Sequence, residues 1–268
     1  MIDDIDGKLD QMRTLLLKMK SVLIAYSGGV DSTLLLKVAH EVLSENVLAV
    51  TAKSPLYPAS ELEIAKTMAR KIGVRHIIID SDELKEVPGF AENSKNRCYL
   101  CKRELFGKLS EIARQEGLSY ILDGSNASDT SDFRPGSQAA KEFGVRSVLK
   151  EVGLTKEEVR EASKRIGLTT HDKPSAACLA SRFPYGKPIT YDSLKIVESA
   201  EECLKGFGLS QVRVRHYNNL CQIEILKEEM HILIKMQDKV VDNLKKLGYT
   251  YVTLDLEGYR TGSMNEDG

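Results

Sequence analysis

The sequence lacks any apolar segment long enough to cross a membrane, because no run approaches the ~18 residues that a spanning helix needs. Its N-terminus, MIDDIDGKLDQ, is acidic and has no hydrophobic region typical of a secretory signal. No low-complexity tract is present, and 42% hydrophobic with 29% charged residues indicates a globular rather than a disordered chain. We therefore expect a cytoplasmic protein without membrane association.

The sequence also lacks an excess of either charge. Its 38 basic and 39 acidic residues leave a net charge of −1, so no overall field attracts a polyanion, and nucleic acid is not an expected partner. The five cysteines are an odd number in a chain without an export signal. This favours thiols, metal ligands or catalytic sulfur over a framework of disulfides.

The first part of the chain alternates short β-branched segments with amphipathic ones. The alternation predicts a parallel α/β sheet with helices on both faces, preceded by a helix from about Asp4 to Lys20. The expected strands are VLIAY, NVLAVTA, VRHIIID, SYILDG and VRSVLK.

The second part has a different pattern. A capping box at 155–158 predicts a helix to Ile166, and a segment at 167–188 reads as a linker or a functional loop. A helix at 191–205, the strands QVRVRHY and CQIEIL, a helix at 228–247 and the strand YVTLDL are expected to follow. We predict an α/β domain at 1–180 and a small α+β domain at 181–268, which binds substrate or provides the surface for a homo-oligomer.

The segment SGGVDS, residues 27–32, lies between the first predicted strand and a helix. Its two glycines allow close approach of another group, and amide N–H groups at a helix N-terminus attract anions. The alternative is a plain turn in which Ser27 or Asp31 caps the helix. Neither G-x-x-x-x-G-K-[ST] nor G-x-G-x-x-G occurs, which excludes the P-loop NTPases and the Rossmann oxidoreductases.

The hexapeptide resembles the pyrophosphate loop of the N-type ATP pyrophosphatases, or PP-loop enzymes. This resemblance implies an adenine nucleotide α-hydrolase-like fold and ATP as a substrate that is split between its α and β phosphates. The expected nucleotide-binding residues are Ser27, Gly28, Gly29, Asp31, Ser32, Gly124 and Arg134.

The segment DGSNASDTSDFRPG follows the fourth predicted strand and is expected at the same sheet edge as the loop. Asp129 and Asp132 would repel a phosphate unless Mg²⁺ lies between them, and Arg134 could bind a phosphate bidentately. Alternatively, the segment is a solvated loop with Asx turns.

Three cysteines form a candidate site. Cys98 and Cys101 lie three residues apart at the predicted start of a helix, and Cys178 lies in a proline-containing polar segment. Three thiolates suit a [4Fe–4S] cluster, or Zn²⁺ with His171 as a fourth ligand, and a redox pair at Cys98 and Cys101 is a further possibility. The other two, Cys203 and Cys221, have the spacing of core residues.

The motifs YSGGVDS, DGSNASDTSDFRPG, KPSAACLASRFPYG and VTLDLEGYRTGSMNE together resemble the LarE family. These are the PP-loop sulfur transferases that make the nickel-pincer nucleotide of lactate racemase. The resemblance covers nearly the whole chain. It implies adenylation of a carboxylate of pyridinium-3,5-biscarboxylic acid mononucleotide and replacement of AMP by sulfur from sulfide or another donor.

One subgroup of this family lacks the C-x-x-C and gives up the sulfur of the cysteine that matches Cys178. The other holds a [4Fe–4S] cluster on three cysteines, and this chain resembles it through Cys98, Cys101 and Cys178. The expected catalytic residues are Cys178 and Asp31, and the expected cofactors are Mg²⁺ and the cluster.

Arg213 and Arg215 lie on one face of a predicted strand, and the resemblance implies that they bind the substrate phosphate. If Asn218–Asn219 is a two-residue turn, Arg213 lies opposite Glu224, with which it could instead form an ion pair. In the same register Arg215 faces a glutamine and is expected to have no acidic partner. Glu224 matches a metal-binding acid of the family and is a candidate Mg²⁺ ligand.

Three other functions remain open at this point. A tRNA-thiolating enzyme would share the loop, the adenylation and even a three-cysteine cluster, but it would require a basic surface. An ammonia-using synthetase would have no use for the three cysteines. A regulatory ATP-binding module stapled by zinc would perform no catalysis.

Overall fold

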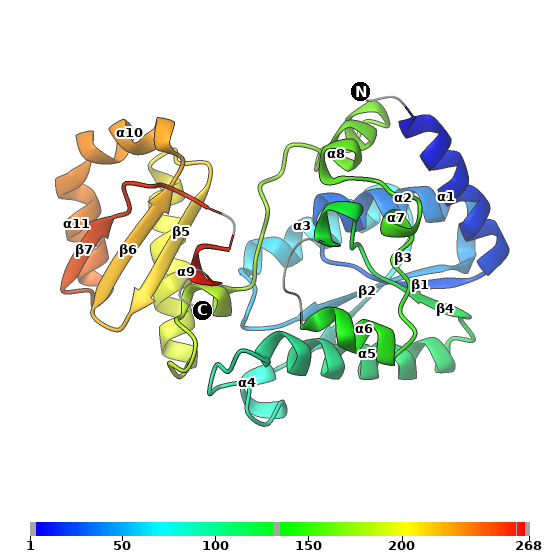
Figure 1. The fold of residues 1–268 in the computed structure, drawn as a ribbon, viewed down its shortest axis with the longest axis horizontal. Coiled ribbons are helices and arrows are strands. Elements are labelled where there is room, and N and C mark those ends of the chain that lie inside the picture. Colours follow the sequence, from blue (N-terminus) through cyan, green and yellow to red (C-terminus); the bar gives the residue numbers. More distant parts are fainter. Residues whose placement is uncertain (1–3, 131–134, 261, 266–268) are drawn as a thin grey trace. The chain divides into compact units, whose positions relative to one another are not determined.

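The computed structural model describes residues 4–130, 135–260 and 262–265, and these form two compact units (Figure 1). The first unit comprises Met1–Asp82 and Asn96–Ser175, and the second comprises Glu83–Lys95 and Ala176–Gly268. Within the described ranges, every helix is too short or too polar to span a lipid bilayer.

The first unit is a four-stranded parallel sheet between two layers of helices. The strands are in the order β3-β2-β1-β4, and neighbouring strands are all parallel. The order reverses between β1 and β4, which is the place where open α/β sheets bind ligands. The elements are α1 Ile5–Met19, β1 Val22–Ala25, α2 Val30–Leu43, β2 Val47–Lys53, α3 Ala59–Ile72, β3 Arg75–Asp80, α5 Arg97–Gln115, β4 Tyr120–Leu122, α6 Gly136–Glu142, α7 Val148–Glu151 and α8 Lys156–Arg165.

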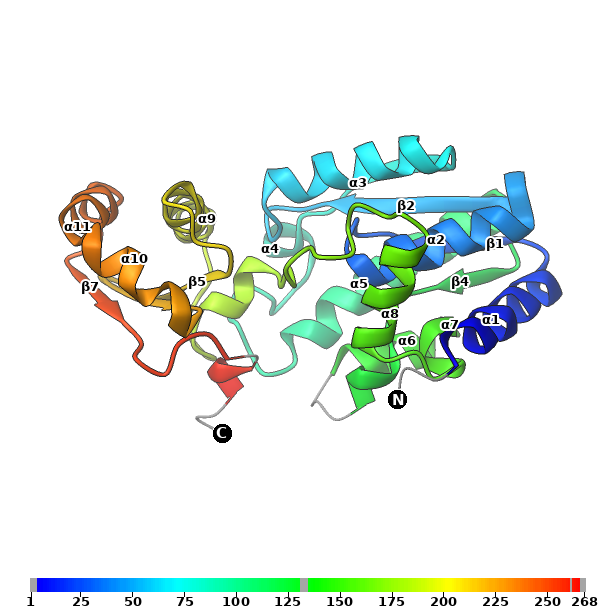
Figure 2. The same cartoon turned by 90° about the horizontal axis from the view of Figure 1, so that it is seen from above.

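The helices cover both faces of this sheet, as the sequence predicts (Figure 1). Seen from above, α3, α2 and α1 follow one another across one face, where α7 and α8 also pack (Figure 2). The other face is covered by α5 and α6. The strands alternate accordingly, since Ile24 belongs to the core under α2 and Leu23 to the core under α5. The fold is the α/β class with an adenine nucleotide α-hydrolase-like sheet.

The fifth predicted strand, VRSVLK, is wrong. Its only sheet contact in the described chain is an isolated bridge between Arg146 and Leu122, after which α7 begins at Val148. Val148 and Leu149 are both fully buried in one core. A strand would direct these neighbours to opposite faces, whereas a helical turn can bury both.

The second unit is a three-stranded mixed sheet with helices. The strand order is β5-β6-β7, where β5 and β6 are antiparallel and β6 and β7 are parallel. The predicted helix at 228–247 is wrong in one respect, because it is divided at Met236, whose N–H donates to the Leu233 carbonyl at 3.1 Å in a tightened turn. The elements are α4 Glu83–Glu86, α9 Tyr191–Gly206, β5 Val212–Tyr217, β6 Leu220–Ile225, α10 Met230–Lys235, α11 Gln237–Lys246 and β7 Tyr251–Leu254.

The core of the second unit lies between this sheet and its helices. Cys221 is fully buried there, as predicted, and burial raises the pKa of its thiol to about 12, so it stays protonated. Cys203 is only partly buried and lies outside this core, contrary to prediction.

Candidate functional site

The segment SGGVDS, residues 27–32, lies between β1 and α2, and we call it the phosphate loop. Its conformation depends on Gly28 and Gly29. Gly28 has φ +70°, and a Cβ there would lie 2.8 Å from the Ala65 Cα of α3. Only glycine fits this position without strain. Gly29 is the N-cap of α2, and no described side chain caps that helix. The first amides of α2 are therefore available to an anion.

Two hydroxyls complete the loop. The Oγ atoms of Ser27 and Ser32 lie 3.1 Å apart, and Ser32 donates to the Gly29 carbonyl at 3.3 Å. The Gly29 N–H donates to Ser27 Oγ at 3.3 Å, which is a long bond. Phosphate oxygens could replace these weak internal bonds.

The segment after β4 lies against the first turn of α2, as the topology predicts. A Cβ on Gly124 would lie 3.0 Å from the Ser32 amide nitrogen, so glycine permits this approach. Asn126 Nδ2 donates to Asp31 Oδ1 at 2.8 Å and holds that carboxylate. Asn126 was not among the expected site residues, although its place in the motif after β4 gave a signal.

Asp31 lies at this sheet edge and has a raised pKa. Burial raises its pKa above the ordinary value, the bond from Asn126 lowers it, and the negative charge of Asp129 raises it again. Two neighbouring carboxylates such as Asp31 and Asp129 are ligands that Mg²⁺ favours. The other two residues expected here, Asp132 and Arg134, lie outside the described residues.

The candidate cysteines lie in different units. Cys98 and Cys101 are in the first turn and a half of α5, in the first unit, and Cys98 is exposed. Cys178 is in the second unit, so the convergence of the three thiols remains a prediction. Among described residues, no group of three or more His, Cys, Asp or Glu side chains is arranged to hold a metal ion.

The backbone at Cys178 is held firmly within the second unit. Its carbonyl accepts hydrogen bonds from the Ser181 Oγ at 2.8 Å and from Arg182 Nη1 at 3.2 Å. The Arg182 guanidinium is oriented by Glu201, which accepts from Nε and Nη2 at 2.7 and 3.0 Å. Sequence reasoning missed Arg182 and Glu201, because nothing in the local pattern brings residues 19 positions apart together.

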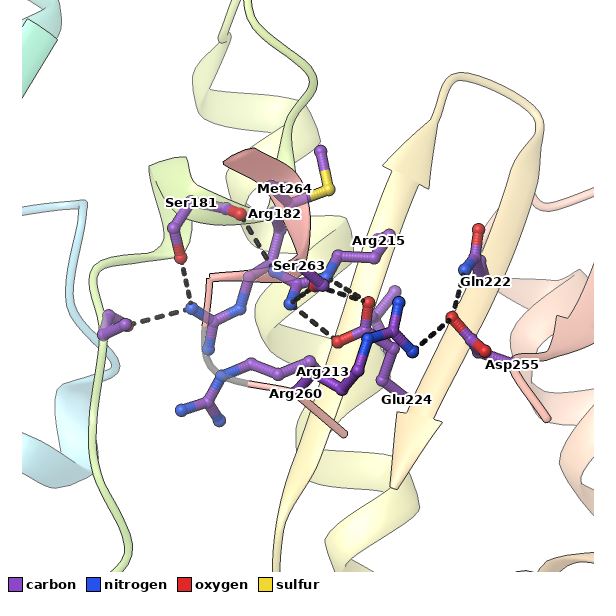
Figure 3. Close-up of polar contacts among 12 residues, drawn as sticks. Ser181, Arg182, Arg213, Arg215, Gln222, Glu224, Asp255, Arg260, Ser263 and Met264 are labelled. Carbon is purple, nitrogen blue, oxygen red and sulfur yellow. Dashed lines mark hydrogen bonds and ion pairs between the residues drawn. The ribbon is translucent and has the colours of Figure 1, made fainter. Parts of the chain in front are cut away.

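The hairpin of β5 and β6 has the predicted register, with Arg213 opposite Glu224 and Arg215 opposite Gln222. The expectation that Arg215 has no acidic partner is wrong. Its Nε and Nη2 donate to the two oxygens of Glu224 at 2.8 and 2.6 Å, and Ser263 also contacts both residues (Figure 3). The long side chain reaches the acid diagonally across the strands. The role of Glu224 as a Mg²⁺ ligand remains a prediction.

Arg213 is buried among other charged residues of the second unit. Its pKa is lowered to about 10, chiefly by burial and then by the positive charge of Arg182, while the negative charge of Glu201 opposes the shift. The two other buried arginines of this region, Arg182 and Arg215, pair with the buried Glu201 and Glu224 respectively. Guanidinium groups bind phosphate through charge-assisted hydrogen bonds.

The sheet order and the SGGVDS loop define the chain as a PP-loop α/β protein. A family model described as "Queuosine biosynthesis protein QueC" matches residues 21–99. The chain is 37% identical to the pyridinium-3,5-bisthiocarboxylic acid mononucleotide synthase of Lactiplantibacillus plantarum, over 92% of this chain and 90% of that protein. It is 44% identical to an uncharacterized protein of Synechocystis, over 97% and 98% of the respective chains.

A more distant relative is the tRNA-specific 2-thiouridylase MnmA of Rickettsia felis, which is 25% identical over 59% of this chain and 53% of that protein. The long match to the synthase decides the family. This chain belongs to the family of pyridinium-3,5-bisthiocarboxylic acid mononucleotide synthases, the LarE-type sulfur transferases, as its motifs predict.

Proposed function

We propose that this chain is an ATP-dependent sulfur transferase that acts on pyridinium-3,5-biscarboxylic acid mononucleotide. A substrate carboxylate is adenylated with release of pyrophosphate, and sulfur then displaces AMP to leave a thiocarboxylate. The observation that carries this proposal is the phosphate loop at the sheet edge, in a chain that matches the synthase along nearly its whole length.

In the adenylation step, the loop binds the departing pyrophosphate. The amides at the start of α2 and the hydroxyls of Ser27 and Ser32 donate to its oxygens. Asp31 and Asp129 would hold Mg²⁺, which neutralises charge on the phosphates. Gly124 keeps the β4 segment close to the loop, so these groups stay in place during the reaction.

The substrate phosphate is assigned to Arg213 and Arg215 of β5. Both guanidiniums are buried, where a charge-assisted hydrogen bond to a phosphate is only weakly screened, and this supports the role. The orientation of Arg215 is set before the substrate binds, because Glu224 and Ser263 already hold its guanidinium. A phosphate here would fix the pyridinium ring relative to the second unit.

The sulfur is assigned to the three-cysteine site. Cys98 and Cys101, one helical turn apart on α5, fit a shared cluster, and thiolates are the ligands that iron–sulfur clusters require. Cys98, Cys101 and Cys178 would hold a [4Fe–4S] cluster, which supplies the sulfur when bound. Arg182 and Ser181 donate hydrogen bonds to the Cys178 carbonyl, which fixes the backbone from which the Cys178 side chain extends.

The test is an anaerobic reaction of purified enzyme with the biscarboxylated nucleotide, MgATP and sulfide, followed by mass spectrometry. The proposal predicts pyrophosphate, AMP and a product in which oxygen is replaced by sulfur. Thiolation of tRNA instead would support a function like that of the named thiouridylase. One turnover that leaves dehydroalanine at Cys178 would support sacrificial transfer, with zinc or no metal at the C-x-x-C.

A further inference from the structure

Lys173 contacts the phosphate loop through the backbone carbonyl of Gly28. Its Nζ donates to the Gly28 carbonyl at 3.1 Å and to Glu61 Oε2 at 2.7 Å. The side chains of Lys173 and Glu61 are only 12% and 20% exposed, so water screens this contact weakly. All three residues belong to the first unit.

The peptide between Gly28 and Gly29 has unusual freedom. A peptide plane flanked by two glycines can rotate at little steric cost. Because a trans peptide directs its C=O and N–H to opposite sides, the group that holds the Gly28 carbonyl also sets the direction of the Gly29 N–H. That N–H, next to the N-terminus of α2, makes a long bond of 3.3 Å to Ser27 Oγ, which a phosphate oxygen could replace.

The turn that carries Lys173 is itself braced. Arg160 of α8 donates from Nη1 to the His171 carbonyl and from Nη2 to the Lys173 carbonyl, both at 2.7 Å. The ammonium therefore approaches the loop from a fixed backbone, and Glu61 restricts its direction further. Hydrogen bonds from a charged donor of this kind are stronger than neutral ones.

We propose that Lys173 is a positioning residue for the nucleotide reaction. Its ammonium, oriented by Glu61, fixes the Gly28–Gly29 peptide with the Gly29 N–H directed toward the phosphates. It also polarises that peptide, which makes the N–H a better donor. The inference rests on the proposed use of the loop for ATP, and it assigns to Lys173 a role through the peptide rather than a contact with phosphate.

Two measurements test this role. Calorimetry gives the affinity for pyrophosphate and for MgATP, and steady-state kinetics gives the KM and kcat for ATP. Lys173→Met is expected to weaken pyrophosphate binding and raise the KM for ATP by about 10-fold, the effect of losing one charge-assisted hydrogen bond. Lys173→Arg should restore both to within about 3-fold. Lys66→Met is the control, because it removes an ion pair with Glu63 on α3 that has the same 2.7 Å length but is more exposed, and none of its described bonds reaches the loop.

Thermal unfolding of each variant shows whether the fold is kept. If Lys173→Met unfolds, Lys173→Gln retains a neutral donor and is expected to bind pyrophosphate with intermediate affinity. If the wild type binds pyrophosphate and a folded Lys173→Met or Lys173→Gln variant binds it with the same affinity, the role of Lys173 is refuted. The proposed function is not affected by that result. A wild-type chain that binds neither ligand refutes the proposed function and this role with it.

Discussion

Replacing Gly28 by alanine tests how tightly the phosphate loop is packed. The residue has φ +70°, which costs alanine about 1–2 kcal/mol, partly offset by about 0.4–1 kcal/mol from a less flexible unfolded chain. The new Cβ would also lie 2.8 to 2.9 Å from three atoms of Ala65, and such overpacking costs about 1–3 kcal/mol. We expect Gly28→Ala to lower the free energy of unfolding of the first unit by about 2–4 kcal/mol.

Gly117→Ala is the matched control. Gly117 has φ +67°, but a Cβ there meets nothing within 4 Å, so only the backbone strain remains, about 1 kcal/mol. Urea unfolding followed by hydrogen exchange of peptides from the first unit measures both variants, and calorimetry measures pyrophosphate binding. Only Gly28→Ala should lose binding. Equal destabilisation by the two variants would refute the packing argument.

Three further changes test the charges. Asp31→Asn keeps an acceptor for Asn126 and should raise the melting temperature of the ATP-free chain, because a carboxylate with a raised pKa destabilises the fold when it is ionised. The same change should slow adenylation on the order of 100-fold. A lower melting temperature would contradict this reasoning. Glu224→Gln should destabilise the second unit by about 3–5 kcal/mol, because Arg215 is left buried without its carboxylate partner. Adding Arg215→Met to this variant should restore stability in urea unfolding. A double variant no more stable than Glu224→Gln would contradict this explanation. Burial raises the pKa of Glu201, but its arginine partners lower it more, so the net pKa lies below the ordinary value of 4.5. The stability that the Glu201 carboxylate contributes should therefore be lost as the pH falls below 4.5. Circular dichroism should show this loss in the wild type but not in Glu201→Gln.

The phosphate loop and the sheet could be predicted because their signals are local. A strand, two glycines and an amphipathic helix in succession are typical of an anion-binding turn at a sheet edge. The order of the four strands then brings Gly124 to Ser32 and Asn126 to Asp31. The β5–β6 register was equally predictable, because the Asn218–Asn219 turn fixes every pair after it.

Contacts that depend on the reach of a long side chain could not be predicted. Register alone places Arg215 opposite a glutamine, yet its guanidinium spans the strands to Glu224. Lys173 contacts Gly28 across 145 positions of sequence, and no periodicity encodes that distance. Packing in three dimensions, rather than local propensity, selects these partners.

The two secondary-structure errors have the same origin. The segment VRSVLK has the composition of a strand, but its single bridge to Leu122 ends where Val148 and Leu149 can both be buried by a helical turn. The helix at 228–247 has continuous helical propensity, yet it divides at Met236 while Leu233 and Val240 pack in one core. In both cases tertiary burial overrides the local pattern.

The most direct test of the proposed chemistry counts products per enzyme molecule. Anaerobically prepared protein is analysed for iron and sulfide and then supplied with the biscarboxylated nucleotide, MgATP and excess sulfide. The proposal predicts about four irons per chain, their loss in Cys98→Ala, Cys101→Ala and Cys178→Ala, and more thiocarboxylate than enzyme. An iron-free protein that makes no thiocarboxylate under these conditions would contradict it.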